Sequence, residues 1–186
     1  MADAKAWRAW LDKKHSASDG IWLVLAKKGT LKPTSLTYAQ ALEEALCFGW
    51  IDGQARGGVE GTFTQGFTPR RKRSPWSKRN TGIAERLVAE GRMHQAGIAE
   101  MERAKSDGRW EAAYAGPAAI EVPPELESAL AASPKALAKF ETLTSQNRYA
   151  ILYRIATAKR AETRATRIQQ FVAMLARGET IYPQKT

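Results

Sequence analysis

Residues 36–53, LTYAQALEEALCFGWIDG, decide the fold class, because a complete helix signal is followed at once by a strand signal. Thr37 and Gln40 have the spacing of a capping box, in which each side chain accepts a hydrogen bond from the other residue's backbone N–H. Apolar residues recur at helical spacing after this cap, at Ala41, Leu42, Ala45 and Leu46. We expect the helix to end near Gly49 and residues 50–53 to form a short strand that leads into a turn.

Segments on both sides extend this pattern. Residues 4–14 place Trp7, Trp10 and Leu11 on one helical face, and residues 21–25 are an apolar run typical of a buried strand. Residues 62–68 alternate in polarity as a strand does, whereas the glycine-rich residues 54–60 indicate a surface hairpin or loop. The first 76 residues therefore predict a small antiparallel or mixed sheet with packed helices.

From Ser77 onward the pattern is mainly helical. Helices are expected from Ser77 to Gly91, around residues 98–105, and at residues 125–131, 134–143 and 146–177, the last with a break near Ala161. The predicted fold class is α+β, with a mainly helical C-terminal half. We see no linker, so we expect one domain, residues 1–186, in which a helical part (77–186) packs on an α+β part (1–76).

The composition restricts both compartment and chemistry. One cysteine, Cys47, and two histidines are too few for an internal disulfide or an ordinary structural zinc site. The N-terminus lacks the apolar core of a signal peptide, and no apolar run is long enough to span a membrane. We therefore expect a cytoplasmic protein with no membrane span, metal or cofactor. Catalysis by Cys47 is disfavoured, because Glu43 and Glu44 lie one helical turn before it and a reactive thiolate needs positive surroundings.

The positive charge of the chain is concentrated in two blocks. The net charge is +10, and residues 54–86 and 148–186 each carry an excess of six basic groups, whereas residues 87–147 are acidic overall. A clustered positive field attracts anions such as nucleotides, nucleic acid or acidic protein surfaces. The alternative is that the charge serves solubility alone.

The first block contains the strongest candidate site. Between two prolines, a basic run leads to a tryptophan and then to a helix start, and its candidate ligand-binding residues are Arg70, Arg71, Arg73, Trp76, Ser77 and Asn80. Arginine binds phosphate bidentately, an indole can stack on a base, and a helix N-terminus offers free N–H groups to an anion. The alternative interpretation is a solvated basic loop in which Trp76 packs into the core and Ser77 only caps the helix.

Asp52 adds a carboxylate beside two glycines at a strand end. It could act as a base or an orienting group for a ligand, or it could only cap the turn. We favour a third interpretation, in which Asp52 pairs with Arg70 or Arg71 and fixes the basic loop.

The second block contains a stripe of arginines. Arg160, Arg164 and Arg167 fall at positions i, i+4 and i+7 of the last predicted helix, so they share one face. Such a stripe can grip a phosphate backbone or an acidic partner. It is equally typical of the exposed face of an amphipathic helix.

Short segments along nearly the whole chain carry a family resemblance. They are Trp10-Leu11 with His15, residues 20–23 (GIWL), 36–38 (LTY), 41–53 (ALEEALCFGWIDG), 67–71 (FTPRR), 76–77 (WS), 91–93 (GRM), 107–110 (DGRW), 159–160 (KR), 162–164 (ETR) and 167–168 (RI). In these segments the chain resembles the YdeI/OmpD-associated family, also called bacteriocin-protection proteins. The resemblance implies a role in envelope stress or in resistance to bacteriocins and cationic peptides, and it implies neither a catalytic motif nor a cofactor.

We therefore predict a stress- or resistance-type protein that binds an anionic ligand through the basic loop and is more a binding protein than an enzyme. The expected ligand is a phosphate-containing small molecule or nucleic acid. One alternative is an enzyme acting on a small phosphorylated or carboxylated substrate, with Asp52 as acid or base and Arg70 as an electrostatic clamp. The other is a basic module that binds an acidic protein.

Overall fold

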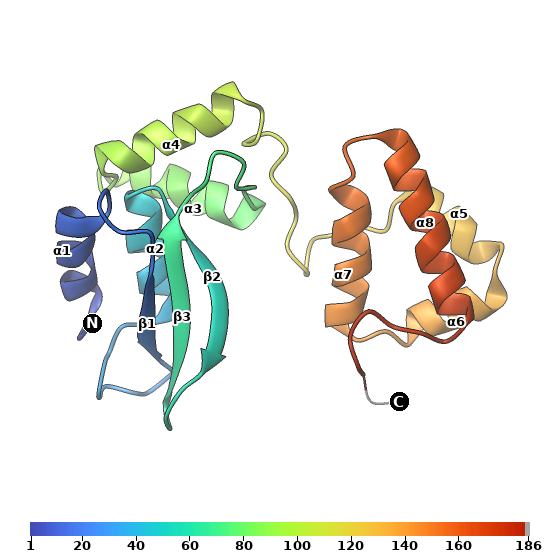
Figure 1. Ribbon diagram of the computed structural model, residues 1–186, viewed down its shortest axis with the longest axis horizontal. Coiled ribbons are helices and arrows are strands. Elements are labelled where there is room, and N and C mark those ends of the chain that lie inside the picture. Colours follow the sequence, from blue (N-terminus) through green and yellow to red (C-terminus); the bar gives the residue numbers. More distant parts are fainter. Residues whose placement is uncertain (185–186) are drawn as a thin grey trace. The chain divides into compact units, whose positions relative to one another are not determined.

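The computed structural model describes residues 1–184, which divide into two compact units between Ala113 and Tyr114 (Figure 1). The first unit contains α1 (Ala4–Lys14), β1 (Ile21–Ala26), α2 (Tyr38–Cys47), β2 (Trp50–Gly57), β3 (Thr62–Pro69), α3 (Lys78–Ala89) and α4 (Gln95–Ser106). The second contains α5 (Pro124–Ala131), α6 (Pro134–Glu141), α7 (Ser145–Ala156) and α8 (Ala161–Ala176). The predicted α+β class, with sheet and helices first and a helical C-terminal half, is confirmed.

The sheet has three antiparallel strands in the order β1-β3-β2, so β3 is its centre. Ile21 of β1 lies opposite Phe67, and Trp50 of β2 lies opposite Pro69. Helix α2 packs on one face of the sheet and begins with the predicted capping box, in which Thr37 and Gln40 hydrogen-bond each other's backbone. Residues 36–53 thus contain the predicted helix followed by the start of the predicted strand.

Strand β2 differs from the prediction, because it continues to Gly57 through residues expected to form a loop. The pairing with β3 shifts between Asp52 and Ala55, which is a β-bulge. At this bulge the Gln65 side-chain amide donates a hydrogen bond to the Gly53 carbonyl at 2.7 Å. Gly53 and Gly57 therefore lie in a bulged edge strand, which is held by backbone pairing with β3.

Aromatic side chains fill the core of the first unit. The Trp7 and Trp10 rings are stacked with centroids 5.2 Å apart, and the Trp50 ring meets both edge-on. The indole N–H groups of Trp7 and Trp50 are satisfied by backbone, since Trp7 donates to the Ala41 carbonyl and Trp50 to that of His15. This cluster fixes α1 against α2 and the start of β2.

The first unit extends beyond residue 76, where the sequence led us to divide the chain into parts. Helices α3 and α4 add Ala84, Leu87, Met101 and Ala104 to the same core as the sheet. The boundary between the compact units therefore lies at residues 113 and 114. The expectation of a single domain stays a prediction.

The second unit has its own core, built from α5 to α8. Its buried apolar residues are Leu126, Leu130, Ala136, Phe140, Ile151, Leu152, Ile155, Ile168 and Leu175. The break expected near Ala161 is present as the turn between α7 and α8.

Replacing either of two helical glycines by alanine should change stability, in opposite directions. A Cβ at Gly97 in α4 would lie 2.2 Å from the Cys47 carbonyl oxygen, whereas one at Gly82 in α3 would meet no atom within 4 Å. We expect Gly97→Ala to destabilise the protein by about 1–3 kcal/mol or more through overpacking. We expect Gly82→Ala to stabilise it by about 0.5–1 kcal/mol through helix propensity and unfolded-state entropy. Urea unfolding of both variants measures the difference, and equal effects would contradict the packing shown here.

Candidate functional site

The basic loop begins with an arginine that is not exposed. Arg70 follows the end of β3 and is 6% exposed, and its guanidinium carbon lies 3.6 Å from the Trp76 ring centroid. One guanidinium nitrogen also donates to the Pro75 carbonyl at 3.0 Å. Trp76 is itself 1% exposed, so its indole packs in the core and is not available to stack on a ligand. Arg70 and Trp76 therefore close the loop upon itself.

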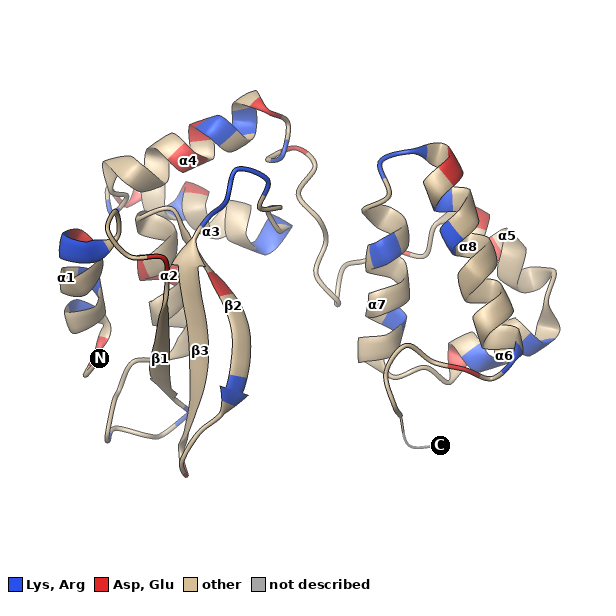
Figure 2. Ribbon diagram, viewed as in Figure 1, with Lys and Arg blue, Asp and Glu red and all other residues tan. Residues whose placement is uncertain are grey.

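Between these two residues the chain turns outward and exposes its cations. Arg71, Lys72 and Arg73 are exposed, and Figure 2 shows them as the blue loop between β3 and α3. The turn is closed by two hydrogen bonds between Arg71 and Ser74. Arg109 reaches the loop from beyond α4 and donates to the Ser74 carbonyl at 3.0 Å.

Ser77 and Asn80 have structural partners at the start of α3. The Ser77 hydroxyl accepts a hydrogen bond from the Asn80 backbone N–H at 3.2 Å, and the Asn80 side chain is buried. Of the candidate residues, Arg71 and Arg73 are the exposed ones, while Trp76, Ser77 and Asn80 hold the loop and the helix start.

Asp52 has a partner that the sequence did not suggest. Its carboxylate accepts a hydrogen bond from the Tyr38 hydroxyl of α2 at 2.9 Å. Burial, and then the charge of Asp52, raise the pKa of Tyr38 to about 12. Within residues 1–184 the exposed Arg71 side chain forms no ion pair with Asp52, because β2 directs Asp52 toward the first turn of α2. The expected pairing of Asp52 with Arg70 or Arg71 is thus not seen with Arg71, and with Arg70 it stays a prediction.

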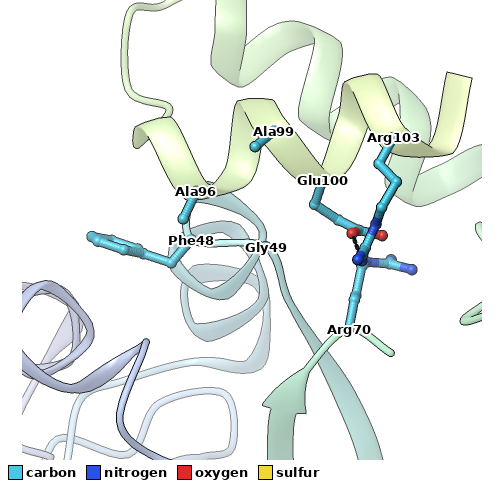
Figure 3. Close-up of a pocket in the computed structure, with 7 residues that line it drawn as sticks. All are labelled: Phe48, Gly49, Arg70, Ala96, Ala99, Glu100 and Arg103. Carbon is cyan, nitrogen blue, oxygen red and sulfur yellow. Dashed lines mark hydrogen bonds and ion pairs between the residues drawn. The ribbon is translucent and has the colours of Figure 1, made fainter. Parts of the chain in front are cut away.

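A pocket of about 290 Å³ lies where Arg70 meets α4. It is lined by Phe48, Gly49, Arg70, Ala96, Ala99, Glu100 and Arg103. Figure 3 shows the Arg70 and Arg103 guanidinium groups converging on the Glu100 carboxylate, while Phe48 and the two alanines lie toward the other end. The pocket therefore has one charged end and one apolar end.

Glu100 organises the charged end. It is buried, and its two oxygens are ion-paired with Arg103 and with Arg109, the latter at 3.1 Å. Arg109 also pairs with Asp107, and this hydrogen bond lowers the pKa of the Asp107 carboxyl. A buried carboxylate with each oxygen bonded to a guanidinium group orients both of these groups.

The sequence did not point to Glu100, Arg103 and Arg109 as site residues, because they lie in the segment whose net charge is acidic. The available signal was the spacing of Glu100 and Arg103, three residues apart on one helix, which is typical of an ion pair.

Cys47 lies near the pocket but is not placed for catalysis. It is buried, and burial raises the pKa of its thiol, with the Glu44 charge acting in the same direction. The rings of His15 and His94 pack against Phe48, with centroids 5.2 and 4.7 Å from its ring. No cluster of three or more metal-ligating side chains occurs within residues 1–184.

The arginine stripe of the second unit is divided between roles. Arg160 precedes α8 at its N-cap position, and Arg164 and Arg167 lie within the helix and are half-buried. Arg167 donates to the Arg154 carbonyl of α7. The stripe thus partly ties α8 to α7, and its role as a ligand surface stays a prediction. None of the described helices is long and apolar enough to cross a membrane.

Comparison with protein families places both halves of the chain. Residues 119–178 match the family described as bacteriocin-protection, YdeI or OmpD-associated. The chain therefore carries a YdeI/OmpD-associated domain in this segment. Residues 1–100, which include the sheet, the basic loop and most of the pocket, match a domain of unknown function (DUF8412). The family prediction is confirmed, although most of the segments that suggested it lie in the part matched by this second domain. No curated protein and no solved structure matches the chain.

The hydrogen bond between Tyr38 and Asp52 can be tested through the ionisation of the Tyr38 hydroxyl. Because the folded-state pKa of Tyr38 lies above its ordinary value of 10, the folded state holds this proton more tightly than the unfolded chain. Its contribution to stability is present below pH 10 and is lost as the pH rises through about 12. We expect Asp52→Asn to lower the pKa of Tyr38, measured as tyrosinate absorbance against pH. Asp107→Asn is the control, and an unchanged titration in Asp52→Asn would contradict the pairing.

Proposed function

We propose that the first unit binds a small anion, a carboxylate or phosphate, in the pocket that Arg70 and Arg103 line, with the exposed loop cations attracting it. The observation that carries this proposal is the convergence of two guanidinium groups at one end of a pocket of about 290 Å³ (Figure 3). This volume is at the lower end of small-ligand pockets. Guanidinium groups are the side chains best suited to bind a planar carboxylate or a phosphate.

The local charge balance supports the same conclusion. Glu100 is the one acidic residue in the pocket lining, and Arg103 and Arg109 neutralise it. Arg71, Lys72 and Arg73 add three exposed positive charges in the loop that continues from Arg70. An anion approaching this end therefore meets an excess of positive charge, which raises its local concentration.

The enzymatic alternative has less support. It requires Asp52 and Arg70 in one pocket, but Asp52 is not among the lining residues and is bonded to Tyr38. The alternative of a basic protein-interaction module is favoured by no specific contact. The stress or resistance role and the cytoplasmic location stay predictions.

Removing Arg103 tests the pocket. Arg103→Ala deletes one charge-assisted donor set, which is worth about 1.5–3 kcal/mol per lost hydrogen bond. We expect pyrophosphate or citrate to bind about tenfold more weakly or worse, as measured by isothermal titration calorimetry. The matched control is Arg177→Ala, which removes an exposed, ion-paired arginine in the second unit and should bind as the parent does. Equal affinity of Arg103→Ala and the parent protein would overturn the proposal.

Replacing Glu100 tests the sign of the charge effect. Glu100→Gln keeps the size of the side chain and removes the negative charge at the pocket. Provided that thermal unfolding shows a folded protein, we expect tighter binding of the same anions, opposite in direction to Arg103→Ala. Weaker binding by folded Glu100→Gln would contradict the expectation that the negative charge of Glu100 opposes anion binding.

A further inference from the structure

The sheet of the first unit has one face that points away from the core. Side chains alternate along a strand, so Leu23 and Leu25 of β1 are buried while Trp22 and Val24 point to the opposite face. Trp22 is 43% exposed and Val24 is 37% exposed. In Figure 1 helix α2 lies behind the sheet, on the buried face that it packs against. We call the face that carries Trp22 the outer face.

A stacked pair of planar groups occupies the outer face. Trp22 lies opposite Gly66 of β3, and its ring atoms are 3.7 Å from the place where a Gly66 Cβ would be. The indole therefore lies across the central strand, where glycine leaves room for it. Arg56, on β2, places its guanidinium carbon 3.8 Å from the centre of the Trp22 ring.

A threonine lies beside this pair, and the strands and loops that build the sheet carry an excess of cations. Thr64 lies between Val24 and Arg56 in the same cross-strand row. Residues 15–37 and 50–77, which form β1, β2, β3 and their adjoining loops, carry eight basic and three acidic residues. One of the acidic residues, Asp52, is bonded to Tyr38. The basic loop starts at Arg70, about 13 Å along β3 from Gly66 at roughly 3.3 Å per residue.

We infer that the outer face is a stacking platform for the bases of a single-stranded nucleic acid, whose phosphates are drawn by the basic loop. Bases stack on aromatic rings and on arginine planes alike, so the layered Trp22–Arg56 pair offers a stacking surface. The excess of cations over acidic groups matches a phosphate backbone. The part assigned to the loop rests on the proposed anion binding, whereas the stacking rests on Trp22 and Arg56 alone.

The experiment measures fluorescence anisotropy of labelled twelve-nucleotide thymidine and uridine oligonucleotides with the full-length protein at low salt. We expect Trp22→Ala to weaken both oligonucleotides by about tenfold, the scale of one lost base–aromatic contact. We expect it to leave the binding of inorganic polyphosphate, which has no bases, unchanged. Arg56→Ala should weaken the oligonucleotides as well, and Trp22→Tyr should restore most of the affinity. A preference for uridine or for thymidine oligonucleotides distinguishes RNA from DNA as the source of the strand.

The control is Val88→Ala, which removes an exposed apolar side chain from α3, outside the sheet. Oligonucleotide affinity unchanged in Trp22→Ala and Arg56→Ala overturns the inference, and the same holds if the parent binds polyphosphate but no oligonucleotide. Either outcome leaves the proposed anion binding standing.

The double variant Arg71→Ala, Arg73→Ala should weaken the binding of oligonucleotides and of polyphosphate together. Failure of the parent protein to bind pyrophosphate would count against the pocket separately. If Trp22→Ala instead lowers the oligomeric state in sedimentation and leaves oligonucleotide affinity unchanged, the outer face is a protein interface and the inference is wrong.

Discussion

The stacking of the Arg70 guanidinium on the buried Trp76 ring is the interaction on which the first unit's candidate site depends. A guanidinium is costly to bury unless it has partners, and here the indole face and the Pro75 carbonyl supply them. Because both ends of the segment are held in the core, the residues between them must turn outward. The turn exposes Arg71, Lys72 and Arg73 and delivers the chain to Ser77, where α3 begins. The exposure of the basic loop therefore follows from the burial of Arg70 at its start.

A second constraint brings α4 to the same place. Gly97 allows the first turn of α4 to touch the end of α2, since a Cβ there would collide with the Cys47 carbonyl oxygen. Gly49 has a φ of +74°, and a Cβ on it would crowd the Ala96 carbonyl. This close approach fixes α4 against the end of α2. It thereby places Glu100 and Arg103 beside Arg70 (Figure 3). The pocket thus depends on two glycines, of which Gly49 also lines it with backbone atoms.

These dependencies explain what the sequence could predict. Helix starts follow from local rules, so the caps at Thr37 and Ser77 and the break between α7 and α8 were predicted near their observed positions. The length of β2 was not, because its glycine-rich second half is held by pairing with β3 and by a bulge. The Asp52–Tyr38 bond joins a strand to a helix, and the Glu100–Arg109 pair joins a helix to the loop after it. Such contacts are fixed by tertiary packing, and the periodicity of residues along the chain does not predict them.

Pairing with carboxylates or backbone, more than position in the sequence, sorts the cations into structural and available groups. Arg8 and Arg92 hold the buried Glu44, and Arg86 and Arg92 hold Glu43, so these guanidinium groups link α1, α2 and α3 with the segment that follows α3. Arg70 also has internal partners, the Trp76 ring and the Pro75 carbonyl, although it stands in the basic run and lines the pocket. A net charge summed over a segment counts all of them equally, yet cations paired with a carboxylate project a weaker field into solvent than exposed, unpaired ones. Among residues 70–73 that field comes from the three exposed side chains after Arg70, which is why an anion would meet the loop before it reaches the pocket.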